Sequence, residues 1–338
     1  MLEEHFLVDS FGRQVTYLRI SLTDRCNFRC IYCMPAEGLP VLPWSQYLTS
    51  EEIIRFVRII GRLGVTRIRL TGGEPLLRED IVEIVSSLKM IDTVHDLSIT
   101  TNGSQLGHLA RSLKEAGLDR INISLDSLNP ERFKKVTLSD TFHEVRDATF
   151  LALRLGFPVK LNMVALRGLT PEEIVDFVRL ACFYPLEVRF LEFMPLCGTG
   201  WKPDLVYPIE EVRQIVGEHF DLQEINPRGD QVAQTFEIRG GKGKVGFIAS
   251  VTEPFCNQCS RIRLSSDGKI HPCLFSDRQV SVKELLREKA PDEKIMETIR
   301  FAVTIKPKGN QFSDHPFQFD QENNFEFQPV PMIRSIGG

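Results

Sequence analysis

The sequence lacks the features that would place it in a membrane or on a nucleic acid. No apolar run approaches the roughly 18 residues that a bilayer-spanning helix needs. Neither sign of charge dominates, since 41 Lys and Arg side chains stand against 45 Asp and Glu and give a net charge of -4. No basic stripe or aromatic RNA-binding motif is present. Any anion-binding site must therefore come from local clustering of cations.

Targeting signals are also missing from the start of the chain. Residues 1–20 show neither the basic-then-apolar pattern of a secretory signal nor the acid-poor, Arg- and Ser-rich character of a transit peptide. We therefore expect a cytoplasmic protein, in which clustered cysteines indicate metal ligands before disulfides. Six of the eight cysteines fall into two groups. Of the others, Cys182 is expected to be a small buried residue, and Cys197 receives no role.

Alternating strand-like and helix-like patterns predict the fold of the first part of the chain. Helical patterns such as Ser50–Leu63 and Asp80–Met90 separate the apolar strand candidates. Six such units in about 200 residues predict an α/β fold with a partial, open (β/α)6 barrel, because a full eight-stranded barrel usually takes ~250 residues. The strand candidates are Tyr17–Ser21, Arg67–Thr71, Leu97–Thr101, Arg120–Leu125, Val159–Val164 and Glu187–Phe193.

The pattern changes after about residue 225, where hairpin signals replace the alternation. One predicted hairpin spans Thr235–Ser250, and a second spans Arg261–Ile270 with its turn at Asp267-Gly268. Two helical stretches follow. We therefore divide the chain into a barrel domain, residues 1–225, and a C-terminal β-hairpin and helical extension, residues 226–338, that carries a second cysteine group.

The first cysteine group, Cys26, Cys30 and Cys33, has the spacing C-x3-C-x2-C. Three thiolates in one loop can bind three irons of a 4Fe-4S cube and leave the fourth iron open. The strand before the loop places this site at the carboxyl end of the barrel strands, where barrel enzymes carry their catalytic residues. A structural zinc site is the alternative, but it requires four ligands and no fourth Cys or His lies nearby.

The second group, Cys256, Cys259 and Cys273, again supplies three thiolates. Two incomplete sets predict two clusters, each with an open coordination position. Because open metal positions are typical of catalytic sites, the pattern favours an enzyme.

Two motifs in order resemble the radical S-adenosylmethionine enzymes. They are Cys26-x3-Cys30-x-Tyr32-Cys33 and, after the next predicted strand, Thr71-Gly72-Gly73-Glu74-Pro75. The resemblance implies that the methionine moiety of adenosylmethionine chelates the open iron and that one electron releases a 5′-deoxyadenosyl radical. Glycines at a strand end allow close approach of a ligand, and the carboxylate of Glu74 suits its ammonium group.

The second group is similar to the auxiliary-cluster region of the GTP 3′,8-cyclases, a family that begins molybdenum cofactor (molybdopterin) biosynthesis. The similarity rests on the segment Cys256–Arg263 followed by Cys273, and it extends from Leu18 to the terminal Gly337-Gly338. It implies two 4Fe-4S clusters, adenosylmethionine, and GTP between them. The adenosyl radical would remove the ribose 3′ hydrogen, and attack on C8 would give (8S)-3′,8-cyclo-7,8-dihydroguanosine 5′-triphosphate. Because the family uses three cysteines here, His271 is expected to be a loop histidine.

The resemblance also implies individual roles. The residues implied to contact adenosylmethionine are Tyr32, Gly73, Ser124 and Met194. Those implied to contact GTP are Arg19, Arg69, Thr100, Lys160, Arg261 and Arg263. Those implied in catalysis are Arg261, Arg263, Gly337 and Gly338. Independently of the resemblance, Arg261 and Arg263 lie two apart on a predicted strand and so share one face, and guanidinium groups suit phosphate oxygens.

Two other functions remain open. A peptide-modifying radical enzyme with a relay cluster would usually need a fourth cysteine to close that cluster, and none follows Cys273. A non-catalytic iron–sulfur carrier or sensor would leave the Gly-Gly-Glu-Pro motif unexplained. As partners we expect the substrate GTP, an external electron donor and, as a candidate, the next enzyme of the pathway. We expect neither nucleic acid nor membrane, and the oligomeric state, monomer or homodimer, remains open.

Overall fold

A curved sheet forms the centre of the molecule. The computed structural model describes residues 6–168, 171–196, 199–225 and 232–310. The strands β1 to β6 are parallel neighbours in chain order, which confirms the predicted partial barrel. Their bounds are β1 (Tyr17–Ser21), β2 (Arg67–Thr71), β3 (Asp96–Thr101), β4 (Arg120–Ser124), β5 (Val159–Ala165) and β6 (Leu186–Glu192).

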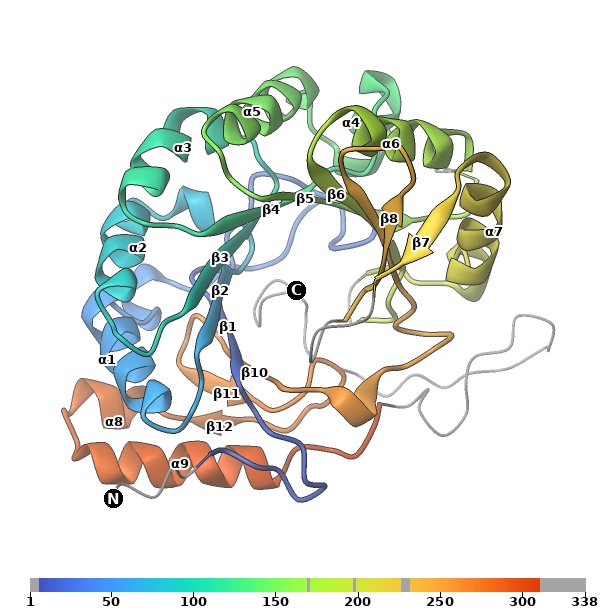
Figure 1. Cartoon of the computed structure of the whole chain (residues 1–338). Helices are drawn as coiled ribbons and strands as arrows, with labels where there is room; N and C mark the ends of the chain where they lie inside the picture. Colours follow the sequence, from blue (N-terminus) through green and yellow to red (C-terminus); the bar gives the residue numbers. More distant parts are fainter. Residues whose placement is uncertain (1–5, 169–170, 197–198, 226–231, 311–338) are drawn as a thin grey trace.

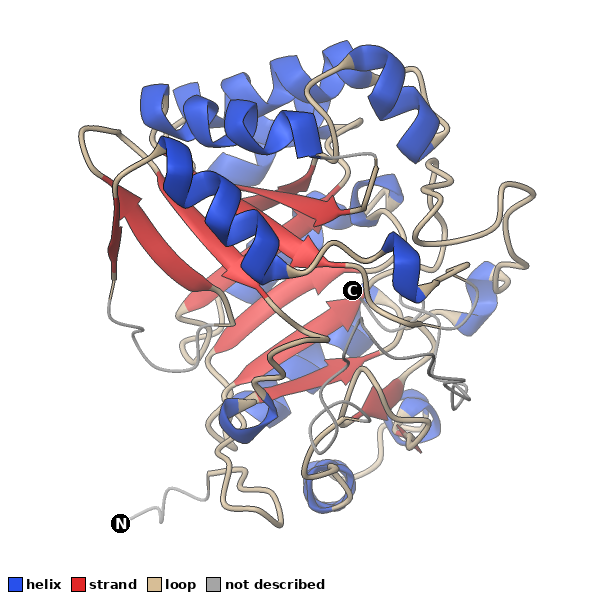
Figure 2. Ribbon diagram, turned by 90° about the vertical axis from the view of Figure 1, so that its right-hand side faces the viewer, coloured by secondary structure: helices blue, strands red, loops and turns tan. Residues whose placement is uncertain are grey.

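In the described part of the chain, helices cover the convex side of this sheet (Figure 1). Figure 2 shows them as a layer outside the strands. They are α1 (Ser50–Gly61), α2 (Ile81–Lys89), α3 (Leu106–Glu115), α4 (Pro130–Thr137), α5 (Phe142–Arg154), α6 (Pro171–Phe183) and α7 (Ile209–His219). Within the described residues, no helix is long and apolar enough to cross a membrane.

The C-terminal strands lengthen the sheet at both of its edges. At one edge β10 (Arg261–Leu264) runs parallel to β1, followed by β11 (Lys269–His271) and β12 (Val280–Ser281). At the other edge β9 (Lys244–Ile248) runs parallel to β6, followed by β8 (Gln234–Ile238) and β7 (Leu222–Glu224). Both predicted hairpins are therefore present, and they belong to one sheet, which has 12 strands within the described residues. The boundary at residue 225 stays a prediction.

Two helices near the end of the described residues attach this extension to the first helix of the barrel. They are α8 (Lys283–Arg287) and α9 (Asp292–Thr304). Arg55 of α1 donates to the Asp292 carboxylate of α9 at 2.9 Å, and Arg62 lies 3.0 Å from the same carboxylate. At the start of α1, Thr49 and Glu52 form a reciprocal capping box that fixes where the helix begins.

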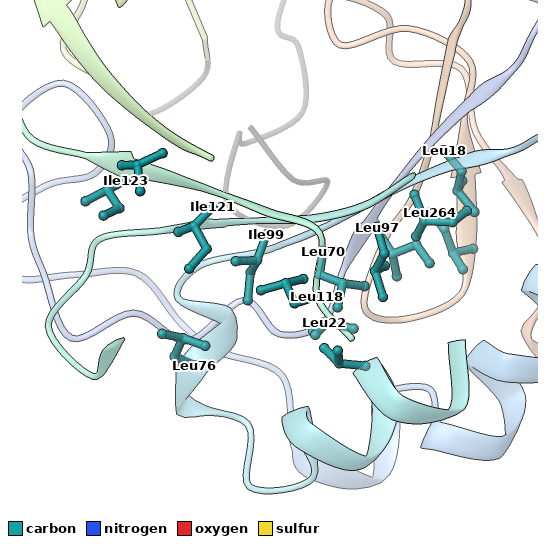
Figure 3. Packing of buried hydrophobic residues seen from close by; sticks show 14 of the residues in the cluster. Leu18, Leu22, Leu70, Leu76, Leu97, Ile99, Leu118, Ile121, Ile123 and Leu264 are labelled. Atoms are coloured by element: carbon teal, nitrogen blue, oxygen red, sulfur yellow. The ribbon is translucent and has the colours of Figure 1, made fainter. Parts of the chain in front are cut away.

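The alternation of side chains along each strand separates the core from the concave face. Leu18, Leu70 and Leu264 are fully buried between the strands and the helices (Figure 3). Because successive side chains on a strand point to opposite faces, the intervening Arg19, Arg69 and Arg263 lie on the other side. The apolar half of the pattern therefore builds the core, and the charged half forms the wall of a cavity.

Candidate functional site

A cavity of about 500 Å³ occupies the concave face of the sheet. It collects residues from β1 to β6, from β10 and from both cysteine loops. Gly337 and Gly338 lie outside the described residues. All the other predicted site residues line the cavity: Arg19, Cys26, Cys30, Tyr32, Cys33, Arg69, Gly73, Thr100, Ser124, Lys160, Met194, Cys256, Cys259, Arg261, Arg263 and Cys273.

The two cysteine groups approach this cavity from opposite ends of neighbouring strands. The first group follows the carboxyl end of β1. Cys256 and Cys259 instead precede the amino end of β10, which is parallel to β1 with Tyr17 beside Arg261. Cys273 follows β11, which is antiparallel to β10 and returns to the same end. A molecule in the cavity therefore has one cysteine group at each end.

Hydrogen bonds from side chains and from the backbone brace the first cysteine loop. Arg29 Nη1 donates to the carbonyl oxygens of Cys26 at 2.7 Å and Phe28 at 2.9 Å. The Phe28 N–H points to Cys26 Sγ at 3.4 Å. On the other side, the N–H of Gly73 donates to the Thr23 carbonyl at 2.7 Å. The loop is thus fixed before any ligand arrives.

The close approach of the segment around Gly73 to the segment around Thr23 requires glycine at both position 72 and position 73. A Cβ at Gly72 would lie 2.4 Å from the Thr23 carbonyl oxygen, and one at Gly73 would lie 2.2 Å from that of Arg25. Gly72 also has a φ of +143°, which L residues rarely adopt. The glycines therefore let two backbone segments meet at the floor of the cysteine loop, and Gly73 still lines the cavity.

Glu74 does not have the predicted role of partner for an ammonium group. Its side chain is completely buried and is absent from the residues that line the cavity. One carboxylate oxygen accepts from Thr101 Oγ1 at 2.7 Å, and the other accepts from the Asn102 N–H at 2.6 Å. Burial raises the pKa of Glu74 to about 7 despite these bonds. The carboxylate ties the end of β2 to the end of β3 instead of facing the ligand.

Tyr32 is held in place from behind by Asp126. The Tyr32 hydroxyl donates to Asp126 Oδ2 at 2.5 Å, and the Val164 N–H donates to Asp126 Oδ1 at 3.0 Å. Burial, partly offset by these bonds, raises the pKa of Asp126 to about 6. Burial and then the Asp126 charge raise the pKa of the Cys30 thiol. The first group therefore lies in a buried and acidic environment.

The second group lies in a cationic environment. Burial alone would raise the pKa of Cys259, but the positive charges of Arg261 and Lys306 outweigh it and lower the pKa to about 6. Lys306 Nζ donates to the carbonyl oxygens of Arg261 and Pro272, each at 2.7 Å. The ammonium group therefore joins the two chain segments that carry Cys259 and Cys273.

A second brace reaches this group from the N-terminal segment. Arg13 Nη1 donates to the Cys256 carbonyl at 2.8 Å, and its Nε lies 2.6 Å from the buried Asp9 carboxylate. Arg13 also donates to the carbonyls of Pro307 and Lys308. One buried guanidinium thus fixes the cysteine loop relative to the segment that leaves α9.

The donor chemistry fits an iron–sulfur cube on each group. The six cysteines are free thiols, and all lie on the wall of the cavity. Among the described residues, no three Cys, His, Asp or Glu side chains converge on a single metal position. One zinc ion requires its thiolates at about 2.3 Å from a single point, whereas a cube distributes its thiolates over separate irons. The three-cysteine sets suit the second arrangement.

Cations dominate the remaining wall of the cavity. Arg120 pairs with Asp96, and Glu187 accepts from Lys160 at 2.6 Å as well as from Arg189. Among the described residues, the wall carries three carboxylates, Asp96, Asp126 and Glu192, and nine cationic side chains: Arg19, Arg67, Arg69, Arg120, Lys160, Arg189, Arg261, Arg263 and Lys306.

This crowding destabilises the charges in the absence of an anion. Burial and then Arg263 lower the pKa of Arg19, and burial and then Arg261 lower that of Arg263 to about 10. Burial and then Arg189 lower the pKa of Lys160 to about 8. A ligand that carries several negative charges would relieve the repulsion among these groups.

Sequence reasoning missed several residues of this wall. Arg67 lies two positions before Arg69, and Tyr17 lies two positions before Arg19. Residues two apart on a strand share a face, so the reasoning that paired Arg261 with Arg263 would also have found Arg67 and Tyr17. Arg189 has no comparable partner within its strand. Its place beside Lys160 follows from the shared carboxylate of Glu187.

Two smaller expectations need correction. His271 is not a loop residue, because it is buried in β11 opposite Arg263. Burial lowers its pKa to about 4, so its ring is neutral. Cys182 is only partly buried at the margin of the core, not enclosed in it. Cys197 lies outside the described residues.

Comparison with known proteins first identifies the class of the fold. Residues 20–181 match the family model of the radical SAM superfamily, and residues 186–312 match the model described as Molybdenum Cofactor Synthesis C. The crystal structure of Streptococcus suis SuiB bound to S-adenosylmethionine superimposes with a TM-score of 0.58 at 15% identity, over 86% of this chain and 69% of that one. The fold is thus that of the radical S-adenosylmethionine enzymes.

Closer relatives then define the family. The GTP 3′,8-cyclase of Syntrophomonas wolfei is 44% identical over 304 residues, which are 89% of this chain and 93% of that protein. The GTP 3′,8-cyclase of Listeria monocytogenes serovar 1/2a is 41% identical over 91% of this chain and 92% of that protein. Human molybdenum cofactor biosynthesis protein 1 is 42% identical over 90% of this chain, which spans 48% of that longer protein. This chain belongs to the GTP 3′,8-cyclase family.

Proposed function

We propose that the cavity carries out the reaction of this family, the cyclisation of GTP to (8S)-3′,8-cyclo-7,8-dihydroguanosine 5′-triphosphate, as the first step of molybdenum cofactor biosynthesis. The observation that supports it is the placement of two three-cysteine groups at opposite ends of one cation-lined cavity. The described part of the wall, with nine cations against three carboxylates, favours a polyphosphate over a peptide.

The chain supplies ligands and positions for its cofactors. Cys26, Cys30 and Cys33 would hold one 4Fe-4S cluster, and Cys256, Cys259 and Cys273 the other. Together with adenosylmethionine, such a cluster supplies one-electron cleavage of a sulfonium and thereby a radical that removes a hydrogen from ribose C3′. The external electron donor this requires is itself part of the proposal.

Protein residues position the reacting groups and exclude water. Tyr32, fixed by Asp126, and Gly73, fixed against Thr23, form the adenosylmethionine side with Ser124 and Met194. The substrate side consists of the implied GTP contacts Arg19, Arg69, Thr100, Lys160, Arg261 and Arg263. Rigid positioning of this kind brings a short-lived radical close to the hydrogen on ribose C3′ and keeps other hydrogen-atom donors away from it.

An anaerobic assay with GTP deuterated at C3′ tests the proposal. Protein with both clusters, adenosylmethionine and a reductant should form a cyclised guanosine triphosphate, and the deuterium should appear in 5′-deoxyadenosine, both read by mass spectrometry. The Cys26→Ser variant should form neither. Cleavage of adenosylmethionine without deuterium transfer would contradict this function and favour another radical reaction.

A further inference from the structure

Tyr17 lies in the middle of a two-row array of arginines on the cavity wall. The strands β10, β1 and β2 are parallel and in register, so Arg261, Tyr17 and Arg67 form one row. Two residues further along, Arg263, Arg19 and Arg69 form the next. Because in-register residues share a face, one phenol occupies the only non-arginine position of this six-residue array.

The ring of Tyr17 separates these charges. The guanidinium carbons of Arg67, Arg69 and Arg19 lie 5.1, 5.4 and 6.0 Å from its ring centroid. Such distances allow cation–π attraction, which partly offsets the repulsion among the arginines. The ring therefore has a structural role that does not involve its hydroxyl.

This structural role of the ring does not explain the hydroxyl group of Tyr17. Tyr17 is 7% exposed and lines the cavity, and its hydroxyl has no hydrogen-bond partner among the described residues. The Nε of neighbouring Arg19 is likewise buried without a partner. Because buried polar groups are nearly always hydrogen-bonded, two such groups on one cavity wall indicate a position at which a ligand binds.

We propose that the Tyr17 hydroxyl donates a hydrogen bond to a phosphate oxygen of the bound nucleoside triphosphate. The surrounding guanidinium groups make an anion the ligand expected at this point, and a phosphate oxygen accepts several donors at once. This inference rests on the proposed function and adds a phosphate contact that neither cysteine group nor the arginines supply.

Protonation of the phenol follows from the same array. Burial alone would raise the pKa of Tyr17, but Arg69, Arg19, Arg120 and Arg261 outweigh burial and lower it to about 8. Arg67 also faces the ring, and Asp96 lies beside Arg67 on β3. Below pH 8 the neutral hydroxyl donates to phosphate, and above pH 8 the phenolate repels it. Bound phosphate therefore favours the protonated phenol.

The Tyr17→Phe variant removes the hydroxyl and keeps the ring among the arginines. With the full chain carrying both clusters, the Kd for GTP should rise by about 10- to 100-fold, the range expected for loss of a hydrogen bond to a charged group. Equilibrium dialysis measures this value. Iron content and melting temperature should match those of the unsubstituted protein.

Competition with the two halves of the substrate identifies which half Tyr17 contacts. Inorganic tripolyphosphate should compete with GTP less well in Tyr17→Phe than in the unsubstituted protein, whereas competition by guanosine should be unchanged. Tyr207→Phe is the matched control, because Tyr207 is 6% exposed, lies under Arg167 at 4.8 Å and is outside the cavity wall.

A pH series separates a direct contact from a structural effect. The advantage of the unsubstituted protein over Tyr17→Phe should be largest below pH 8 and should shrink above it. Lys160, whose pKa is also about 8, contributes equally to both proteins and cancels in the ratio.

The possible results distinguish failure of the Tyr17 contact from failure of the proposed function. An unchanged Kd for GTP in Tyr17→Phe, or an equal loss of affinity for guanosine, would overturn the phosphate contact. Failure of the unsubstituted protein to bind GTP at all would instead overturn the proposed function.

Discussion

The two cysteine groups share their ligand number and differ in their electrostatic surroundings. In each, the N–H two residues beyond a cysteine points to its sulfur, from Phe28 to Cys26 and from Phe275 to Cys273, both at 3.4 Å. Burial and then Glu74 raise the pKa of Cys26 to about 11, whereas Arg261 and Lys306 lower that of Cys259 to about 6.

This difference suits two different tasks. Negative neighbours disfavour the addition of an electron to a cluster, and positive neighbours favour it. The first group is therefore suited to a strongly reducing centre that gives its electron away. The second is suited to a centre that binds an electron-rich or anionic ligand.

Removal of one thiolate from each group should give the largest contrast. Cys26→Ser should abolish cleavage of adenosylmethionine, because its chelation requires the first cluster. Cys259→Ser should abolish cyclisation of GTP and leave slow cleavage of adenosylmethionine. Anaerobic measurement of 5′-deoxyadenosine and of the cyclised nucleotide distinguishes the two.

Iron analysis is the control for this pair, since each variant should keep about one cube of the two. If Cys259→Ser also lost all cleavage of adenosylmethionine while keeping the first cube, the separation of tasks would be wrong.

Alkylation of the metal-free protein should show the electrostatic difference directly. The thiolate is the reactive form, so the rate rises with pH up to the pKa of each thiol and is then constant. The rate for Cys259 should be half-maximal near pH 6 and close to its plateau by about pH 7, whereas the rate for Cys26 should still be rising at pH 9. At pH 7.5 the larger thiolate fraction of Cys259 is partly offset by the lower nucleophilicity of a low-pKa thiolate, so we expect iodoacetamide to modify Cys259 roughly 10- to 30-fold faster than Cys26, as read by peptide mapping.

Lys306→Met sharpens this test, because it removes one of the two charges that lower the pKa of Cys259. In this variant, the pH profile of the alkylation rate of Cys259 should move to higher pH, whereas the profile of Cys26 should not change. A common midpoint for both cysteines would refute the contrast.

The two arginine braces should act locally. Arg13→Gln removes the cationic partner of the buried Asp9 carboxylate, which keeps its bonds from the backbone N–H groups of Phe11 and Arg13, and should lower the free energy of unfolding by about 3 kcal/mol. Arg29→Gln removes two bonds to carbonyls in a half-buried position and should cost about 1.5 kcal/mol. Denaturant unfolding measures both values.

Hydrogen exchange shows where each brace acts. Amides of residues 254–260 should exchange faster in Arg13→Gln, and those of residues 24–34 faster in Arg29→Gln. Each variant is the control for the other, and equal effects on both loops would show that the braces stabilise the whole fold instead.

The smallest expected difference is in the free energy of unfolding when either Phe28 or Phe275, one phenylalanine from each cysteine loop, is replaced. Phe28 is 2% exposed and contacts Phe133 edge-on at 5.8 Å between ring centroids, so Phe28→Leu should cost about 1 kcal/mol. Phe275 is only half buried, and Phe275→Leu should cost less than about 0.5 kcal/mol. Thermal unfolding checks both, and a larger loss in Phe275→Leu would contradict this order.

Local patterns predicted much of the fold and of the site. The six central strands were predicted to within one residue of their observed bounds, and both hairpin turns were found, because strand and turn signals depend on neighbouring residues. The family resemblance supplied the implied ligand sets, and every such residue within the described ranges lies on the cavity wall.

Errors arose where a residue's partners are distant in sequence. Glu74 was assigned to a ligand, yet its partners Thr101 and Asn102 lie 27 and 28 residues further along the chain. Arg13, which braces a loop 243 residues away, carried no signal at all. Such contacts depend on how strands and loops meet in space, and no periodicity records them.

The sequence by itself determined the strands, their apolar and charged faces and the two sets of three thiols, since each of these depends on spacing along a short segment. Only the tertiary structure decided that β10 pairs with β1, and that pairing places the second group at the opposite end of the cavity and completes the arginine array around Tyr17. The physical reason is that pairing between remote strands is selected by burial of both faces and closure of long loops, which are properties of the whole chain.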